Sequence, residues 1–337
     1  MDTSEHILVL SETGKCEEEI SWIDQEGKSC SFRLELLPEL KGNAFHFNCC
    51  CNGLLLYQIE SSGQAFLINP LREEVLFLRE RPSEFSISGA ETFKRYCGLG
   101  AGGITGQYKV VMAGSQKRKQ QDKCYYNNIA HIMTLGSTEW RVIQSVPNWD
   151  YEGSPVFENG FLYWMQSREE RKPQQLLAFD VENEIFSTME TPSQVDWMVD
   201  LGGYLGLVHA SSEGLRVWFA TSHNNQGKIT TWGVRDPIAV HHDGKQISSY
   251  SLRLLGFWKD SKVLIMYIET QKYFFSYDFA FGNLTVIEYP RRATYEYKTF
   301  KGSSLSISEF HASSEMVYVT PGQMYNTRRS DLIKRDD

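Results

Sequence analysis

The strongest constraint in this sequence is a short strand–turn–short strand pattern that recurs along the whole chain. Apolar and aromatic runs, such as residues 161–164, 205–208 and 263–267, each follow a turn containing Gly, Asn, Asp or Ser. Such runs are typical of short β-strands. No stretch keeps the i, i+3, i+4, i+7 apolar spacing of an amphipathic helix over three turns. The sequence therefore predicts an all-β protein.

The expected strands form groups that recur roughly every 40 to 57 residues, a period typical of β-propeller blades. Five groups cover residues 44–79, 95–144, 154–189, 200–235 and 250–289. N-terminal strands at 6–10, 19–24 and 31–36 and C-terminal strands at 304–310 and 315–320 together make a sixth group, which would remove exposed sheet edges. We predict a single six-bladed, kelch-like β-propeller over residues 1–322, with a charged tail at 323–337. Seven blades is the alternative.

Loop lengths predict where such a propeller binds. The first and second strands of a group join by tight turns, whereas the joins at 113–127, 167–173, 191–200, 235–248 and 290–302 are long. Long loops on a rigid scaffold usually carry binding residues, and Trp, Tyr and Arg supply most interface energy. The candidate partner-binding residues on this long-loop face are Trp149, Tyr151, Arg168, Arg171, Trp197, Arg235, Arg291, Arg292, Tyr295 and Tyr297. The alternative is that the aromatic ones cap the core between blades.

Charge and composition exclude several classes of protein. The net charge of −8 argues against binding to nucleic acid or to an anionic membrane surface. No apolar run approaches the roughly 20 residues of a membrane span, and the acidic N-terminus lacks the features of a secretory signal. The seven cysteines are an odd number, which indicates reduced thiols. We therefore expect a cytoplasmic or nuclear protein.

The sequence around each candidate catalytic or metal-binding motif does not fit the function that the motif would indicate. Residues 98–103 (GLGAGG) match a dinucleotide-binding fingerprint, but they lead into a strand rather than a helix. A glycine-rich hairpin with close backbone packing is the better interpretation. Cys49, Cys50 and Cys51 alternate between strand faces and lack a C-x2-C pair, so buried small side chains are expected. His241 and His242 have no placed third ligand. We predict no enzyme, no catalytic residue, no metal and no cofactor.

A short basic cluster, Lys117-Arg118-Lys119, lies in a Gln-rich segment that we expect to be a loop. A solvated loop tip is the simplest interpretation. Nuclear import and an acidic partner are the alternatives.

Six segments resemble one family, the plant F-box-associated interaction domains. Residues 50–55 (CCNGLL) resemble its S-C-N-G-L-L opening, and residues 108–111 (YKVV) match its Y-K-V-V. The remaining similar segments are 66–73 (FLINPLRE), 154–164 (SPVFENGFLYW), 177–180 (LAFD), and 201–205 (LGGYL) with Val217-Trp218. Each is weak alone, but their common order over residues 45–220 is specific. The resemblance implies a propeller that recognises proteins.

Members of this family usually begin with an F-box, a helical segment that docks a Skp-type adaptor of a cullin ubiquitin ligase. Residues 1–40 do not resemble that box, so we expect either a protein without it or a fragment. The resemblance implies the substrate-binding part of a Skp-cullin-F-box ligase receptor. Its partners would be client proteins for ubiquitination, with the adaptor only if an F-box is supplied elsewhere. The alternatives are an F-box-less decoy or binding module, a lectin-like propeller that binds glycans on client proteins and, last, a propeller enzyme.

Overall fold

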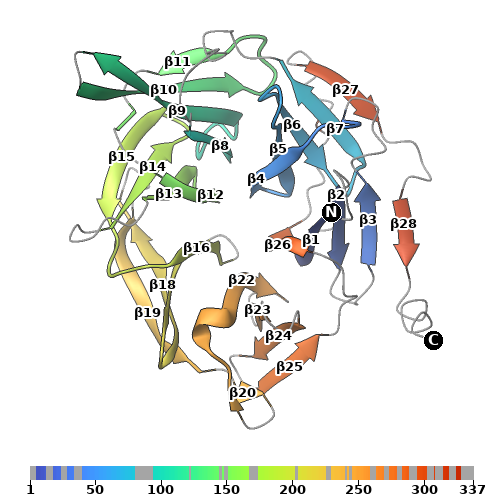
Figure 1. Ribbon diagram of the computed structural model, residues 1–337, viewed down its shortest axis with the longest axis vertical. Helices are drawn as coiled ribbons and strands as arrows, with labels where there is room; N and C mark the ends of the chain where they lie inside the picture. The colour runs from blue at the N-terminus through green and yellow to red at the C-terminus, as the bar shows by residue number, and fades with distance from the viewer. Residues whose placement is uncertain are drawn as a thin grey trace. The chain divides into compact units, whose positions relative to one another are not determined.

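The chain folds into antiparallel β-sheets, as the computed structural model in Figure 1 shows. Apart from a 3-10 turn, η3 (Ser249–Ser251), the described elements are strands. None of the described helical segments is long and apolar enough to cross a bilayer. The structure describes residues 5–12, 18–23, 29–33, 40–79, 94–120, 123–143, 146–147, 151–166, 174–201, 204–224, 229–239, 241–242, 245–258, 263–268, 273–278, 283–287, 294–301, 307, 314–318 and 324–327.

The chain divides into two compact units that are both discontinuous in sequence. Unit 1 comprises Met1–Ala44, Val195–Ser304 and Val319–Asp337, and unit 2 comprises Phe45–Gln194 and Leu305–Tyr318. Each unit therefore contains a C-terminal segment that returns to strands formed much earlier in the chain.

Unit 2 holds three described sheets of four or five strands. Sheet B has the order β27-β7-β6-β5-β4, sheet C the order β11-β10-β9-β8, and sheet D the order β12-β13-β14-β15. The bounds are β4 Phe45–Cys51, β5 Leu54–Ile59, β6 Ala65–Asn69, β7 Glu74–Leu78, β8 Lys94–Ala101, β9 Tyr108–Gln120, β10 Lys123–Thr134, β11 Arg141–Ile143, β12 Tyr151–Glu158, β13 Phe161–Gln166, β14 Gln175–Asp180, β15 Ile185–Glu190 and β27 Ser314–Tyr318.

Unit 1 also holds three described sheets of this size. Sheet A has the order β26-β1-β2-β3-β28, sheet E the order β16-β17-β18-β19, and sheet G the order β22-β23-β24-β25. The bounds are β1 Glu5–Glu12, β2 Glu18–Ile23, β3 Ser29–Arg33, β16 Trp197–Asp200, β17 Leu205–Ser211, β18 Gly214–His223, β19 Ile229–Ile238, β22 Leu252–Trp258, β23 Val263–Ile268, β24 Tyr273–Asp278, β25 Asn283–Ile287, β26 Thr294–Lys301 and β28 Met324–Thr327, and a small ribbon pairs β20 (His241–His242) with β21 (Lys245–Gln246).

The first hairpins of sheets B and D, in chain order, have the same Asn-Gly turn. Asn52 and Gly53 join β4 to β5 with φ of 48° and 79°, and Asn159 and Gly160 join β12 to β13 with φ of 46° and 83°. Positive φ at both central residues is the requirement of the two-residue hairpin turn that matches strand twist. The sequence therefore sets these hairpins locally.

Strand β9 contributes alternate side chains to two separate hydrophobic clusters. Val110 and Met112 pack with residues of sheet B, whereas Val111 and Ala113 pack with residues of sheet D. This follows from the period of two in a strand. The centre of sheet C is thus buried on both faces at residues 110–113, which explains the continuous apolar run there.

Glycines in β8 allow the close approach of sheet D. A Cβ atom on Gly98 would lie 2.9 Å from Trp164 Cζ2, and one on Gly100 would lie 2.6 Å from Val181 Cγ2. The glycine-rich run 98–103 is therefore a packing feature of a strand and the turn after it, as its sequence context predicts. Of the three cysteines of β4, Cys49 and Cys51 are buried among apolar side chains as expected, whereas Cys50 is half-buried.

Three sequence expectations about loops and termini are wrong. Residues 113–127 are not an irregular loop, because β9 and β10 pair up to Gln120 and Lys123. The join expected at 290–302 contains β26, which pairs with β1. The strand expected at 315–320 corresponds to β27 and pairs with β7 of sheet B, while β28 joins the N-terminal strands in its place. Long-range pairing of this kind leaves no local pattern in the sequence.

Candidate functional surface

Five of the ten predicted partner-binding residues lie outside the described residues. They are Trp149, Arg168, Arg171, Arg291 and Arg292. The interface role assigned to them stays a prediction.

Three predicted loop tyrosines belong to strands. Tyr151 is the first residue of β12, and both Tyr295 and Tyr297 belong to β26, where Tyr297 pairs with Val9. The β-branched and aromatic residues that predominate in Thr294–Lys301 favour this strand. Of these three tyrosines the structure describes the backbone.

Trp197 and Arg235 lie at the two edges of sheet E. Trp197 on β16 is half-buried against the apolar cluster of unit 1, whereas Arg235 on β19 is exposed. Their Cα partners, Val208 and Val217, are themselves paired, so the four residues form one row across the sheet. Three strand spacings separate the ends of the row by about 14 Å. Both residues therefore share a row but are not neighbours.

Of the large apolar side chains that the structure describes in unit 2, the most exposed lies on a closed loop between β8 and β9. The loop spans residues 102–107, and Gly102 N donates to Gln107 O at 2.9 Å. Gly106 N donates to Gly102 O at 3.0 Å, and Gln107 N to Thr105 Oγ1 at 3.3 Å. These bonds fix the loop from within. Ile104, in its middle, is 90% exposed.

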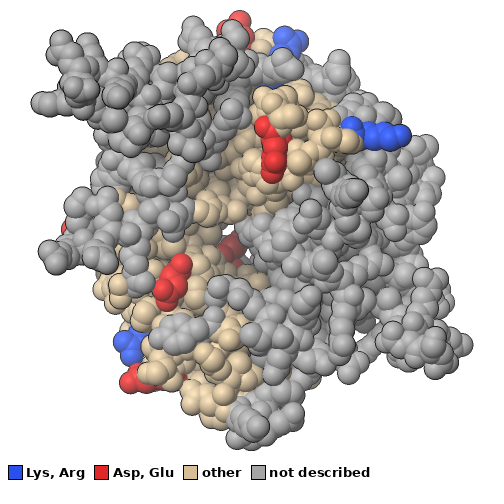
Figure 2. Space-filling view, viewed as in Figure 1, with Lys and Arg blue, Asp and Glu red and all other residues tan. Residues whose placement is uncertain are grey.

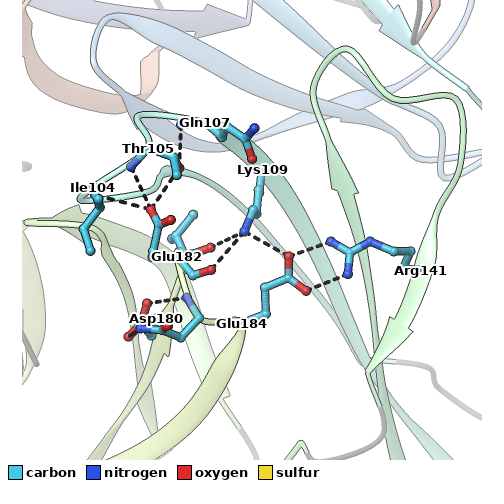
Figure 3. Close-up of polar contacts among 10 residues, drawn as sticks. Ile104, Thr105, Gln107, Lys109, Arg141, Asp180, Glu182 and Glu184 are labelled. Atoms are coloured by element: carbon cyan, nitrogen blue, oxygen red, sulfur yellow. Dashed lines mark hydrogen bonds and ion pairs between the residues drawn. The ribbon is translucent and has the colours of Figure 1, made fainter.

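Glu182 of sheet D fixes this loop from outside, as Figure 3 shows. Its Oε2 accepts from Ile104 N at 3.3 Å, Thr105 N at 3.1 Å and Thr105 Oγ1 at 2.9 Å. The backbone N–H of Thr105 is the main reason why the pKa of Glu182 lies below its usual value. The carboxylate therefore stays ionised at neutral pH, and Ile104 is presented by a restrained backbone.

A second polar contact between sheets C and D lies beside this loop (Figure 3). Lys109 Nζ donates to Val181 O at 2.7 Å and forms an ion pair with Glu184 Oε1 at 2.9 Å. Arg141 of β11 binds both oxygens of Glu184, at 2.5 and 2.8 Å. The Arg141 hydrogen bonds are the main cause of the lowered pKa of Glu184, and Lys109 adds to the effect. This bidentate geometry is a strong form of carboxylate binding.

Apolar side chains and scattered charges make up the described surface. Among the described residues, no group of three His, Cys, Asp or Glu side chains could hold a metal ion. Within the described part of unit 2, the exposed large apolar residues are Ile104, Val142 and Ile185. On the face in Figure 2, the described charged side chains are scattered among uncharged surface. Such a surface offers apolar and backbone contacts to a partner.

Sequence reasoning missed the Ile104 loop because its anchor is distant. Glu182 and Thr105 are 77 positions apart. The available signal was local only, in the glycines that precede Tyr108-Lys109 and in the tight turn after Asp180. Neither indicates that the two segments meet.

Comparison with known proteins identifies relatives of the whole fold. The family model described as "F-box associated beta propeller domain" matches residues 14–317. An Arabidopsis thaliana protein named as an F-box protein is 28% identical over 239 residues, which are 66% of this chain and 55% of that protein. The chain thus spans about half the length of this curated relative.

Solved structures give weaker likenesses. A chain of the nidogen/laminin complex has a TM-score of 0.47 at 11% identity, covering 88% of this chain and 98% of that one. TolB from Acinetobacter baumannii has a TM-score of 0.45 at 9% identity, covering 89% and 67%. At these values neither likeness carries an argument about function.

Proposed function

Because the chain belongs to the F-box associated β-propeller domain family, we propose that it is a non-catalytic protein-recognition module, the substrate-binding part of a Skp-cullin-F-box ubiquitin ligase receptor. The single observation that carries this proposal is the family match over residues 14–317. The similarity to a protein named as an F-box protein supports it.

We propose six blades for the propeller. The family is a propeller family, and the described strands form six sheets of four or five strands. Four antiparallel strands are the usual content of one blade. Seven blades would require a further sheet.

The proposed partner is a client protein, without nucleic acid or membrane. A Skp-type adaptor takes part where an F-box is supplied. The compartment is the cytoplasm or nucleus, which the odd number of cysteines, seven, supports.

The client-binding residues are the ten predicted aromatic and arginine residues. Arg235 is the described member of this set with the most accessible surface, since it is exposed on β19. Arg216 on the neighbouring strand β18 is a matched control, because it is also an accessible arginine in the same sheet. An arginine at an interface contributes through both charge and directed hydrogen bonds.

The test is affinity purification of the tagged chain from plant cells, followed by mass spectrometry and by binding measurements with the purified captured protein. We expect one or a few client proteins. We also expect Arg235→Ala to weaken client binding by about tenfold, the equivalent of about 1.4 kcal/mol. Arg216→Ala should bind as the parent chain does.

Adaptor and cullin peptides among the captured proteins would support the ligase receptor. Capture of client proteins without any ligase component would contradict the ligase-receptor role and favour a free-standing module or decoy. Capture of no protein above a tag-only control would contradict protein recognition itself.

A further inference from the structure

The hairpin of β9 and β10 continues beyond the rest of sheet C. Lys94, the first residue of β8, pairs with Ser115, and Ile143, the last residue of β11, pairs with Ala130. Further out, residues 116–120 and 123–127 pair with each other, and no described strand lies along their outer edges. The dark green strands in Figure 1 show this extension. We name residues 116–120 and 123–127 the ribbon.

The ribbon is basic on an acidic protein. It contains Lys117, Arg118, Lys119 and Lys123 and no acidic residue, and Asp122 is the sole acid in the sequence between positions 116 and 127. The whole chain has a net charge of −8. A local excess of positive charge of this size attracts an acidic partner and orients its approach.

The register combines these charges with two tyrosines. Arg118 pairs with Tyr125, and Lys117 pairs with Tyr126. Paired residues share a face of an antiparallel ribbon, and successive pairs alternate between faces. On each face of the ribbon, the backbone register therefore pairs a basic position with a tyrosine position. Tyr and Arg are enriched among the residues that dominate interface energies.

We propose that the ribbon is a docking element for an acidic, extended segment of a partner protein. An extended segment can add as a strand along an edge of a ribbon, where main-chain hydrogen bonds give affinity. Carboxylates on that segment match the lysines and Arg118. A protein segment fits better than nucleic acid, because a long phosphate backbone would also meet the negative charge of the remaining chain. This inference rests on the proposed protein-recognition function and names the chemistry of the partner.

The test measures binding of the full chain to a fluorescein-labelled peptide of about seven residues that alternates Glu with Val, since this length covers the five residues of one ribbon strand with one residue beyond each end. The same peptide with Gln in place of Glu is the control probe. We expect the Glu peptide to bind more tightly, and raising salt from about 50 to 200 mM should weaken its binding.

Two variants locate the site. Arg118→Glu should weaken binding of the Glu peptide by about tenfold, and Tyr125→Ala should weaken it without changing the charge. Lys41→Glu, which makes the same charge change at an exposed position of unit 1, should bind as the parent chain does. Far-ultraviolet circular dichroism of each variant checks that the sheets are intact.

Equal binding of the Glu peptide by Arg118→Glu and the parent chain would overturn the proposal. So would tighter, Arg118-dependent binding of a single-stranded oligonucleotide of about 20 nucleotides, since it would make the ribbon a polyanion site. If Arg118→Glu changes neither client capture nor binding of the Glu peptide, the docking role of the ribbon is contradicted while the proposed recognition function stands. If peptide binding depends on Arg118 but no protein is captured, the result supports the docking role of the ribbon and contradicts the recognition of a client protein.

Discussion

Sheet C packs against sheet B and against sheet D in two different ways. Against sheet B, an apolar cluster is joined by neutral hydrogen bonds, in which Leu99 N donates to Cys49 Sγ at 3.2 Å and Asn52 Nδ2 to Tyr108 Oη at 3.2 Å. Against sheet D, an apolar cluster is joined by ionised groups, Glu182 and the ion pairs of Glu184. One sheet thus has a neutral junction and a charged one.

This difference between the two junctions indicates that the apolar clusters and the polar contacts play different structural roles. Both clusters contain fully buried side chains, so burial drives the packing of sheet C on both faces. Only the charged junction holds a surface loop, residues 102–107, in a fixed conformation. Electrostatic contacts therefore determine which surface is presented.

The largest expected effect comes from truncating the apolar clusters. Trp164 is 1% exposed in the junction with sheet D, so Trp164→Ala should lower the free energy of unfolding by about 3–5 kcal/mol. Leu99→Ala, in the junction with sheet B, should lower it by about 2–5 kcal/mol. Urea unfolding measures both. A neutral effect at either position would contradict the assignment of that residue to a packed core, and Ile104→Ala is the surface control.

Glu184→Gln should distinguish the two junctions. It removes the charge partner of Lys109, whose side chain is 7% exposed, and should lower the free energy of unfolding by about 2–3 kcal/mol. The value is below that of a fully buried pair because Arg141 is accessible. Equilibrium unfolding at neutral pH measures it.

The same variant has a pH signature. The pKa of Glu184 is lowered in the folded protein, so its contribution is present above its unfolded pKa of about 4.3 and disappears as the pH falls through the folded pKa. The stability difference between the parent chain and Glu184→Gln should therefore shrink on acidification below about pH 4. A constant difference down to pH 2 would mean that this carboxylate is not the titrating group.

Gly100→Ala should have a smaller effect that is confined to the charged junction. The new methyl group would lie 2.6 Å from Val181 Cγ2, and relieving that overlap should cost about 1–3 kcal/mol. Unfolding midpoints of Gly100→Ala and of the parent chain give the value. Full retention of stability would show that sheet D moves freely away from β8.

Tyr108→Phe should have the smallest effect. It removes the acceptor of the Asn52 hydrogen bond in the neutral junction, and one neutral bond contributes about 0.5–1.5 kcal/mol, with exposed bonds at the lower end. No change in the acid limb of the stability curve is expected. A pH-dependent difference would assign ionic character to the junction with sheet B.

The sequence was sufficient to predict the strand groups but not all their pairings. Asn52-Gly53 and Asn159-Gly160 specify their hairpins through the backbone alone, so β4–β5 and β12–β13 could be predicted. The sequence predicts a loop where the ribbon lies, because Lys, Gln and Tyr at positions 117–126 lack the apolar alternation that indicates a strand. The exchange of β27 and β28 depends on their pairing with β7 and β3, two strands that lie far earlier in the sequence.

The candidate surface was predictable to a lesser degree. Residue type indicated Trp197 and Arg235, but their exposure depends on the sheet around them, which buries half of one and leaves the other accessible. The exposure of Ile104 could not be predicted, because residue type does not distinguish an exposed isoleucine from a buried one. The exposure of Ile104 depends on the conformation of its loop, which Glu182 holds through the packing of sheet D on sheet C.

The return of the C-terminal segment to sheet B has a consequence for biosynthesis. Glu74, at the start of β7, accepts a hydrogen bond from Ile307 N, 233 positions later, and β27 then covers the outer edge of β7. At about 5–20 residues per second, a ribosome needs on the order of tens of seconds to make that intervening chain. During this time a nascent sheet B has an unpaired edge, the kind of surface that invites aggregation. We therefore expect the nascent chain to need chaperone protection until its last strands emerge.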